Sequence, residues 1–568
     1  MNYPLISEYI ETVKSAEDNF GELTNLRPVF GEDGQPVMTS GNFAVVFKMK
    51  DEATGKLYAL KCFTKEQEGR AEAYHQIAEE LKDVDSPYLV SIRYLDKELF
   101  VDTDQADETE FPVLLMDWVE GKTLDKYLRE NIDDKYALEM LAYRFSQLAQ
   151  WLIPQPFAHG DLKPDNILVR EDGTLVLVDY DGMYVPAMKG QKARELGSPD
   201  FRHPLRTEND FDEHIDDFPL TTILLSLKAI YNDSQLLEKY GALDRLLLSK
   251  KDYQKISQSN VIRNIFPSDD NELNRLCSIY TLLLSDSRIT GLPPQIYACH
   301  ISIDCIKHFF ELGEKYRRGI DVELDGLLSV RYYRIAAEFG YAKAQYKLGV
   351  CYFCGYGVSV DYTKALYWFQ KAYEQGDIEA LYNIGCIYSK MDIAKAESIY
   401  IDVVEKAKAI IERQESSTEA LGVLGTCLFY GKGIKKDVKK AFEYLKQAAE
   451  KGNDNAQARV GCCFYYGRGV DINKEEAVKW FYLSANKGNP IGEKLLGECY
   501  IKAEGVAENK RLGISLLQRA FNQGELSSQR LLGNCYFKGD GVKKDFTISF
   551  SLKALERFCQ NTSFGIYE

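Results

Sequence analysis

Apolar and polar residues follow two different rhythms along this chain of 568 residues. In the first half, short apolar runs at residues 58–60, 113–116 and 174–178 are typical of buried strands. A helix is predicted between the first two runs, at about residues 66–82. Its apolar positions recur every three or four residues, at Tyr74, Ile77, Ala78 and Leu81. The first half is therefore predicted to mix strands with helices.

In the second half, a dipeptide of an aliphatic residue and glycine recurs with a nearly constant period. It stands at residues 312–313, 348–349, 384–385, 424–425, 460–461, 496–497 and 532–533. The steps between its glycines are 36, 36, 40, 36, 36 and 36 residues. Gly-x-Gly turns and alanine-rich stretches ending in glycine keep the same phase. Each unit is therefore predicted to be helix, glycine turn, helix, glycine stop, which indicates an α-solenoid.

Two units depart from this pattern. The step of 40 residues falls around residues 394–417 and predicts one longer helix pair. At Ala503-Glu504-Gly505 the first turn glycine is missing. Neither departure changes the predicted architecture.

Residues 344–377 and 456–489 resemble Sel1-like repeats, which are relatives of the tetratricopeptide fold. The resemblance covers about residues 311–558. It implies an interaction scaffold, a right-handed superhelix whose concave face holds a protein or a peptide.

The 13 cysteines allow two interpretations, since Cys351-x-x-Cys354 and Cys462-Cys463 could hold a metal. Seven of them stand one or two residues after a repeat glycine: Cys351, Cys386, Cys427, Cys462, Cys463, Cys499 and Cys535. A position that recurs in every unit is a core position, and a reduced thiol packs as a small apolar group. All six histidines lie no later than residue 308, so we favour packing over metal binding.

Composition narrows the class of protein. With 45% hydrophobic and 27% charged residues and a net charge of −16, the chain is typical of folded multidomain proteins, not of disordered chains or coiled coils. It has no run of Lys and Arg residues of the kind that binds the phosphates of nucleic acid. Its longest apolar candidate, 220–230, is shorter than the roughly 20 residues of a membrane span. The first residues lack an export signal. We expect a cytoplasmic protein with reduced cysteines and no nucleic-acid or membrane partner.

The strongest short motif is HGDLKPDNIL at residues 159–168, followed by a strand-like run and by Asp179-Tyr180-Asp181-Gly182. Phosphoryl transfer needs an aspartate to position the attacking hydroxyl and oxygen ligands to hold Mg²⁺. This stretch supplies both. It resembles the catalytic loop and the metal-binding segment of eukaryotic-type protein kinases. A polar surface loop is disfavoured, because the other kinase motifs follow in order.

The resemblance implies a role for each polar residue of this stretch. Asp161 would be the catalytic base, and Lys163 would neutralise the γ-phosphate of ATP. Asn166 and Asp179 would bind Mg²⁺, and they stand 13 residues apart, as the resemblance requires. A lysine two residues after the base resembles the Ser/Thr class. His159 is assigned a structural role.

The expected ATP site lies upstream. Residues 39–47 match the phosphate-covering loop, although only Gly41 remains of three expected glycines. Lys61, on a predicted buried strand, resembles the lysine that holds the α- and β-phosphates. Its partner glutamate is Glu72 by resemblance to related bacterial kinases, whereas Glu79 fits the usual sequence distance better.

Two further landmarks complete the motif set. Residues 113–121 resemble a strand and hinge, so Met116 would border the adenine and the backbone of Asp117 to Val119 would bind it. Asp217 resembles the aspartate that anchors the catalytic loop, and it could also cap the helix that it opens.

The motifs in this order resemble a bacterial group of kinase-like proteins over about residues 1–300. We predict an α+β bilobal kinase-like domain followed by an all-α solenoid. The expected parts are a helical extension at 1–35, the kinase-like domain at 36–310, the solenoid of about seven units at 311–558 and a tail at 559–568.

Gly160 stands where regulated kinases carry an arginine that grips a phosphorylated activation loop. Between Asp181 and Pro204 there is no threonine, and the only serine and tyrosine are Ser198 and Tyr184. We therefore expect an enzyme without activation-loop regulation. At the place of the usual A-P-E motif, His203 is either a loop tether, which we favour, or a ligand or base.

The favoured hypothesis is an ATP- and Mg²⁺-dependent Ser/Thr protein kinase whose repeats bind a protein substrate or regulator. A repeat domain raises the concentration of a bound partner near the active site. Two alternatives stay open. The thin glycine loop favours a pseudokinase scaffold, and the glycine before the base also occurs in small-molecule kinases.

Overall fold

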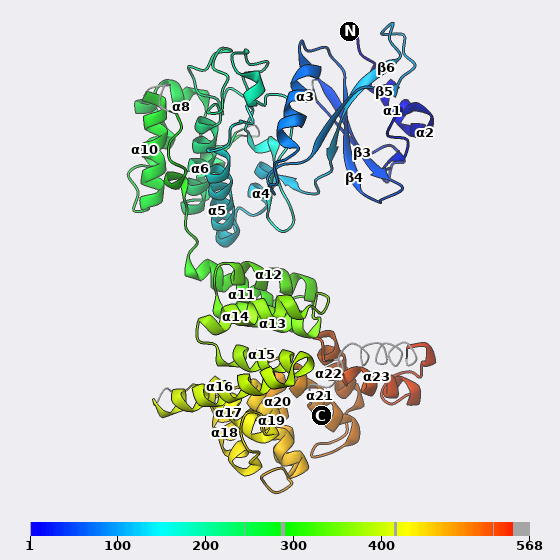
Figure 1. Cartoon of the computed structure of the whole chain (residues 1–568), viewed down its shortest axis with the longest axis vertical. Coiled ribbons are helices and arrows are strands. Elements are labelled where there is room, and N and C mark those ends of the chain that lie inside the picture. The colour runs from blue at the N-terminus through cyan, green and yellow to red at the C-terminus, as the bar shows by residue number, and fades with distance from the viewer. Residues whose placement is uncertain are drawn as a thin grey trace. The chain divides into compact units, whose positions relative to one another are not determined.

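The computed structural model describes residues 2–41, 43–242, 245–285, 290–413, 417–525 and 527–548. The chain divides into two compact units, Met1–Ile301 and Ser302–Glu568 (Figure 1). The division falls immediately before the first helix of the repeats. The boundary predicted from the sequence, between residues 310 and 311, lies within that helix. The expected tail lies outside the described residues.

The first unit opens with short helices and an antiparallel sheet. Its helices are α1 (Ile6–Lys14), α2 (Ala16–Asn19) and α3 (Arg70–Leu81). Its strands are β1 (Leu26–Pro28), β2 (Met38–Ser40), β3 (Ala44–Asp51), β4 (Leu57–Phe63), β5 (Ile92–Phe100) and β6 (Glu110–Asp117). The strand order is β1-β3-β4-β6-β5, and β2 also pairs with β3.

Both faces of this sheet are covered, so β4 and β6 are buried along most of their length rather than alternating. On one face, Ile77 of α3 belongs to the same core as Phe63. On the other face, Tyr9 and Val13 of α1 pack with residues such as Leu60. The Tyr9 hydroxyl also donates a hydrogen bond of 2.7 Å to the Phe63 carbonyl. The opening segment is thus built into the first unit.

The rest of the first unit is mainly helical. Its elements are β7 (Lys122–Thr123), α4 (Leu124–Glu130), α5 (Lys135–Leu152), β8 (Ile167–Val169), β9 (Leu175–Leu177), α6 (Asp217–Asn232), α7 (Gln235–Tyr240), α8 (Lys250–Gln254), α9 (Asn260–Ile265) and α10 (Asn271–Ser285). The strands form a small sheet in the order β7-β8-β9. Helix α6 is buried along nearly its whole length, as its apolar sequence predicts.

The second unit is a ladder of helix pairs. Its helices are α11 (Ile303–Arg318), α12 (Gly326–Glu338), α13 (Ala342–Cys354), α14 (Tyr362–Glu374), α15 (Ile378–Met391), α16 (Ile393–Glu412), α17 (Thr418–Tyr430), α18 (Val438–Glu450), α19 (Asp454–Tyr466), α20 (Lys474–Asn486), α21 (Pro490–Lys502), α22 (Lys510–Asn522) and α23 (Ser527–Lys538). The 40-residue step is explained by α16, which has 20 residues where α14 has 13. The expected fold class is confirmed.

The ladder returns on itself, because the segments at the ends of α20 and α22 contact its first helix. Arg317 of α11 donates hydrogen bonds of 2.9 Å to the Gly488 carbonyl and 2.7 Å to Gln523 Oε1. The neighbouring Arg318 donates to the Asn486 carbonyl at 3.1 Å. A half-buried glutamate of the same helix, Glu314, also pairs with the Arg317 guanidinium group at 2.8 Å. These contacts join segments about 170 to 200 residues apart in sequence.

The repeated cysteines lie in the core, as their phase predicts. Six of the seven are buried, and Cys462 is half-buried. Burial raises the pKa of Cys427, Cys463 and Cys499 to about 12. Over the described part of the chain, no cluster of three or more His, Cys, Asp or Glu side chains could hold a metal ion. The burial of these thiols supports the packing interpretation.

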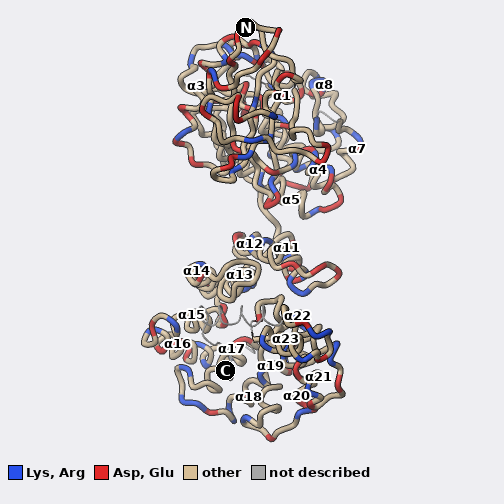
Figure 2. Tube along the Cα trace, turned by 90° about the vertical axis from the view of Figure 1, so that its right-hand side faces the viewer, with Lys and Arg blue, Asp and Glu red and all other residues tan. Residues whose placement is uncertain are grey.

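Acidic and basic residues are mixed along both units (Figure 2). Among the helices of the described segments, none combines the length and the apolar character that crossing a membrane requires.

Ala503 replaces the missing turn glycine and keeps its backbone shape. It ends α21 in the left-handed region, with φ +56°, where α11, α13, α17 and α19 end at a glycine, such as Gly431 at φ +75°. A β-carbon costs about 1–2 kcal/mol in this conformation. We therefore expect Ala503→Gly to stabilise the second unit by about 1 kcal/mol.

The measurement is calorimetric unfolding of the full chain, read at the transition of the second unit. Gly431→Ala is the reverse control, because its new β-carbon would stand 3.2 Å from Lys436 Cβ and should lower the same transition. A lower transition temperature for Ala503→Gly would contradict the strain at this cap.

Candidate functional site

The predicted catalytic loop runs from α5 to β8 and ends in a short 3₁₀ turn, Pro164–Asn166. Its central carboxylate, Asp161, accepts a hydrogen bond of 2.8 Å from Lys163 Nζ and one of 3.1 Å from Asn166 Nδ2. The other carboxylate oxygen accepts from the Ser198 amide at 2.9 Å. Lys163, Asn166 and Ser198 thus all bind the Asp161 carboxylate. These three contacts fix its orientation.

The loop itself is anchored by Asp216 and not by Asp217, which corrects the expectation from sequence. The Asp216 carboxylate accepts hydrogen bonds from the His159 amide and, at 3.0 Å, from the Gly160 amide. Asp217 accepts from the Gly291 amide at 2.8 Å, so it ties down another loop. Two adjacent aspartates at a helix start differ by about 100° in direction, and the sequence does not reveal which one faces the loop.

His159 has the structural role expected for it. The side chain is buried, and its Nε2 lies 2.9 Å from the Val178 carbonyl. Its ring also packs edge-on against Tyr180. The catalytic loop and the segment around Asp179 are thereby held together.

Gly160 has no room for a side chain. Its φ is +81°, and an added β-carbon would stand 1.9 Å from the Gly182 carbonyl oxygen. The close approach of the catalytic loop to the segment at Gly182 therefore excludes the arginine that regulated kinases carry at this position.

Lys61 of β4 is buried, with 6% of its surface exposed, and it is held by two carboxylates. Its Nζ lies 2.7 Å from Asp179 Oδ1 and 2.8 Å from Asp181 Oδ2. Burial lowers the pKa of Lys61, but the two aspartates outweigh it and raise that pKa above its usual value. Lys61 is thus paired with Asp179, which the sequence assigned to Mg²⁺, and with Asp181, to which the sequence gave no role.

Neither candidate glutamate pairs with Lys61. Glu72 accepts a hydrogen bond from Gln76 at 3.4 Å, and Glu79 binds Lys82. Both line a groove along α3 together with Gln76. The reason is helical phase, because the buried face of α3 carries Tyr74 and the glutamates point elsewhere. The second carboxylate in Asp179-Tyr180-Asp181 is the signal that could have found the actual partner.

The remaining ATP-site residues lie on the sheet. Gly41 closes the turn between β2 and β3, where its amide donates to the Ala44 carbonyl at 2.9 Å. Met116 and Val119 are buried at the end of β6. The backbone amides of Asp117 and Trp118 already donate to backbone carbonyls. The Val119 amide is therefore the hinge donor suited to the adenine of ATP.

These groups fit Mg²⁺ and ATP chemically. Asn166 uses its amide nitrogen toward Asp161, so its side-chain oxygen is the atom suited to a metal. The Asp179 side chain remains 43% exposed despite its contact with Lys61. Mg²⁺ is commonly held by one or two protein oxygens plus substrate phosphates, which is the donor set present here.

The segment after Gly182 is tied down by arginines and by His203. Arg194 donates to the Asp181 carbonyl at 2.9 Å, and Arg206 donates to the Gly160 carbonyl at 3.1 Å. His203 Nε2 lies 3.1 Å from the Leu283 carbonyl, and its Nδ1 accepts from the Leu205 amide. Both ring nitrogens are therefore occupied, which agrees with a tether.

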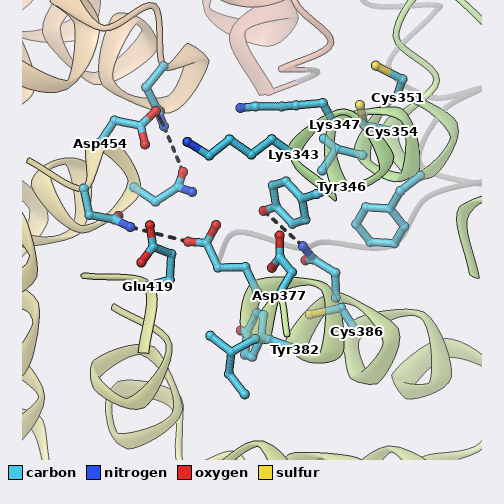
Figure 3. Close-up of a pocket in the computed structure, with 18 of the residues that line it drawn as sticks. Lys343, Tyr346, Lys347, Cys351, Cys354, Asp377, Tyr382, Cys386, Glu419 and Asp454 are labelled. Carbon is cyan, nitrogen blue, oxygen red and sulfur yellow. Dashed lines mark hydrogen bonds between the residues drawn. The ribbon is translucent and has the colours of Figure 1, made fainter. Parts of the chain in front are cut away.

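The second unit encloses a cavity of about 1380 Å³. Its wall comes from the first helices of successive repeats, whose N-terminal turns face inward. Acidic side chains from the starts of α15, α17 and α19 line it: Asp377, Glu379, Glu419 and Asp454 (Figure 3). Lys343 and Lys347, one turn apart on α13, line it as well. Burial, with the charges of Asp377 and Asp454, raises the pKa of Glu379 to about 7.

Family models match both units. The protein kinase domain model matches residues 35–281. The Sel1 repeat model matches residues 310–341, 342–377, 418–453, 454–489, 491–525 and 526–552. The unmatched interval 378–417 holds the helix pair with the long helix α16.

Curated kinases are similar to about a third of the chain. A serine/threonine-protein kinase, sgk-1, of Caenorhabditis elegans is 25% identical over 195 residues, 33% of this chain and 40% of that protein. The RAC serine/threonine-protein kinase of Drosophila melanogaster is 26% identical over 186 residues, 32% of this chain and 29% of that protein. The chain thus spans two fifths or less of the length of these relatives.

Solved structures of repeat proteins are similar to just under half of the chain. A protective antigen of uropathogenic Escherichia coli with an SLR fold is 25% identical, with a TM-score of 0.27. The match covers 46% of this chain and 57% of the chain of that antigen. A Sel1 repeat protein from Oxalobacter formigenes is 24% identical, with a TM-score of 0.24, and covers 46% of this chain and 91% of its own.

Proposed function

Because this chain carries a protein kinase domain followed by six Sel1 repeats, we propose that it is an ATP- and Mg²⁺-dependent Ser/Thr protein kinase whose repeats hold a protein substrate or regulator. The observation that carries the proposal is the network at Asp161. Its carboxylate is oriented by Lys163, Asn166 and the Ser198 amide at once.

Each group then has a defined task. Asp161 accepts the proton of the attacking hydroxyl, and Lys163 stabilises negative charge on the transferred phosphoryl group. Lys61 binds the α- and β-phosphates, while Asn166 and Asp179 offer oxygens to Mg²⁺. The metal, when bound, neutralises charge on the phosphates. The backbone amide of Val119, in the hinge, orients the adenine ring of ATP.

The repeat cavity is the proposed site for the protein partner. At about 1380 Å³ it exceeds the roughly 300–1,000 Å³ typical of small-molecule sites, so it suits a chain segment. Lys343 and Lys347 offer positive charge inside it. We expect that Lys343→Glu with Lys347→Glu lowers phosphorylation of proteins held there, while the KM for ATP is unchanged.

The function is tested by incubating the full chain with Mg²⁺ and γ-labelled ATP, with and without a generic protein substrate. Asp161→Asn and Asp179→Ala serve as background controls, and ATP binding is measured separately by calorimetry. Label on protein that disappears in both variants supports the proposal. ATP binding without turnover would instead favour a pseudokinase scaffold, and label on small molecules alone would favour a small-molecule kinase.

Activity is expected to persist without phosphorylation of the activation segment. Tyr184 is buried, and Ser198 acts through its backbone amide. Ser198→Ala and Tyr184→Phe should therefore keep kcat close to that of the unchanged protein, as measured in the same assay. Loss of activity in a folded Ser198→Ala variant would show that this segment is regulated.

A further inference from the structure

Lys61 takes both of its charged partners from the segment 179–182. The distances are 2.7 Å to Asp179 and 2.8 Å to Asp181. The Asp181 side chain is 14% exposed, whereas the Asp179 side chain is 43% exposed. One partner is therefore accessible to other ligands, and the other is enclosed.

Asp181 also reaches helix α3. Its second carboxylate oxygen accepts a hydrogen bond from the Tyr74 hydroxyl. Tyr74 is 2% exposed and stacks on Tyr94 with ring centroids 5.6 Å apart and planes 6° apart. A side chain packed in this way has little freedom, so its hydroxyl is a fixed donor. Asp181 thus bridges a lysine of the sheet to a tyrosine of the helix.

The phase of α3 makes this bridge an alternative to a glutamate pair. Glu72 and Tyr74 are two positions apart, which places them about 200° apart around the helix. When Tyr74 faces Asp181, Glu72 faces away, where it contacts Gln76. The helix can therefore turn only one of the two groups toward this site, and it turns the tyrosine, which contacts Asp181.

We propose that Asp181, oriented by Tyr74, is the positioning partner of Lys61 and takes the role that a helix glutamate has in the kinases which this domain resembles. The inference rests on the proposed kinase function, because it concerns how Lys61 is held against the nucleotide phosphates. When Asp179 turns to a metal ion, Asp181 still neutralises the buried ammonium group.

This arrangement changes what controls the lysine. Asp181 belongs to the same segment as Asp179, and Arg194 holds the Asp181 carbonyl at 2.9 Å. A shift of α3 would break the hydrogen bond from Tyr74 but would not remove the carboxylate from Lys61. The orientation of Lys61 is therefore set by the segment 179–182, and α3 only refines it.

A double-mutant cycle in the full chain tests the bridge. We expect Asp181→Asn to lower kcat roughly 10–100-fold with a smaller change in the KM for ATP, as for other supporting partners of a reacting group. Tyr74→Phe keeps the ring and should lower kcat about 10-fold. Because Tyr74 acts through Asp181, the double variant should be no slower than Asp181→Asn alone. Additive losses would overturn the bridge.

The control variants are Glu80→Gln, a half-buried residue of the same helix, and Glu72→Gln, which represents the competing pair. A loss of kcat in Glu72→Gln with none in Asp181→Asn would overturn the proposal.

A second measurement does not depend on catalysis. The position of Lys61 is compared in crystal structures of the unchanged protein, Asp181→Ala and Glu72→Gln. The Lys61 ammonium group, which lies 2.8 Å from Asp181, should be displaced in Asp181→Ala and should keep its place in Glu72→Gln. An unmoved Lys61 in Asp181→Ala would overturn the pairing. A protein without turnover that shows this difference would refute the kinase function alone.

Discussion

Asp161→Asn is expected to lower kcat by about 10²–10⁴-fold while the affinity for ATP stays the same. The amide cannot accept a proton from the attacking hydroxyl. It also replaces a charge that Lys163 contacts at 2.8 Å, and this contact is one reason why the pKa of Lys163 is raised in spite of burial. The backbone hydrogen bond from Ser198 can still form, so the loop should keep its shape.

The matched control for this substitution is Asp165→Asn, which removes a carboxylate four residues further along the same loop. Asp165 is exposed, and its variant should keep kcat. Rates and ATP affinities are measured on the full chain, with circular dichroism to verify folding. A loss of less than about tenfold in Asp161→Asn would mean that this carboxylate is not the general base.

Gly160→Ala is expected to destabilise the first unit by more than about 3 kcal/mol and to abolish phosphoryl transfer. The left-handed backbone costs a β-carbon about 1–2 kcal/mol. The clash adds to this cost, because the new methyl group would stand 1.9 Å from the Gly182 carbonyl oxygen. Relief requires that the catalytic loop and the segment after Asp179 move apart, which misplaces both Asp161 and Asp179.

Gly190→Ala separates the two contributions. Gly190 has a φ of +86°, close to that of Gly160, but its β-carbon would have nothing within 4 Å. This variant should lose only the backbone contribution of about 1–2 kcal/mol and should remain active. Both are compared by urea unfolding followed at the first unit. Equal losses in the two variants would contradict the close approach of the two loops.

The repeats could be predicted almost completely from the sequence. Glycines in positive φ, such as Gly355 and Gly467, end helices wherever the period places them. Even the long unit was anticipated, since α16 absorbs the extra residues. The return of the ladder to Arg317 was not predictable, because it depends on small rotations that accumulate over the whole ladder.

In the candidate site, the sequence predicted correctly which residues lie together when they belong to the same short loop. Asp161, Lys163 and Asn166 share one loop, so their spacing determines their contacts. The misses depend on side-chain direction. Asp216 and Asp217 are adjacent acids of which only one faces the loop. The exchange of Glu72 for Asp181 likewise follows from how α3 is rotated against the sheet.

The contacts of Arg317 with Gly488 and Gln523 also determine how the second unit comes apart. An open repeat array frays from either end, since each repeat contacts only its neighbours. Here the first helix is tied to the repeats that end at Gly488 and Gln523, so fraying from the N-terminal side must first separate the Arg317 guanidinium group from these partners. The repeats from Arg317 to Gln523 should therefore melt as one cooperative body rather than in stages.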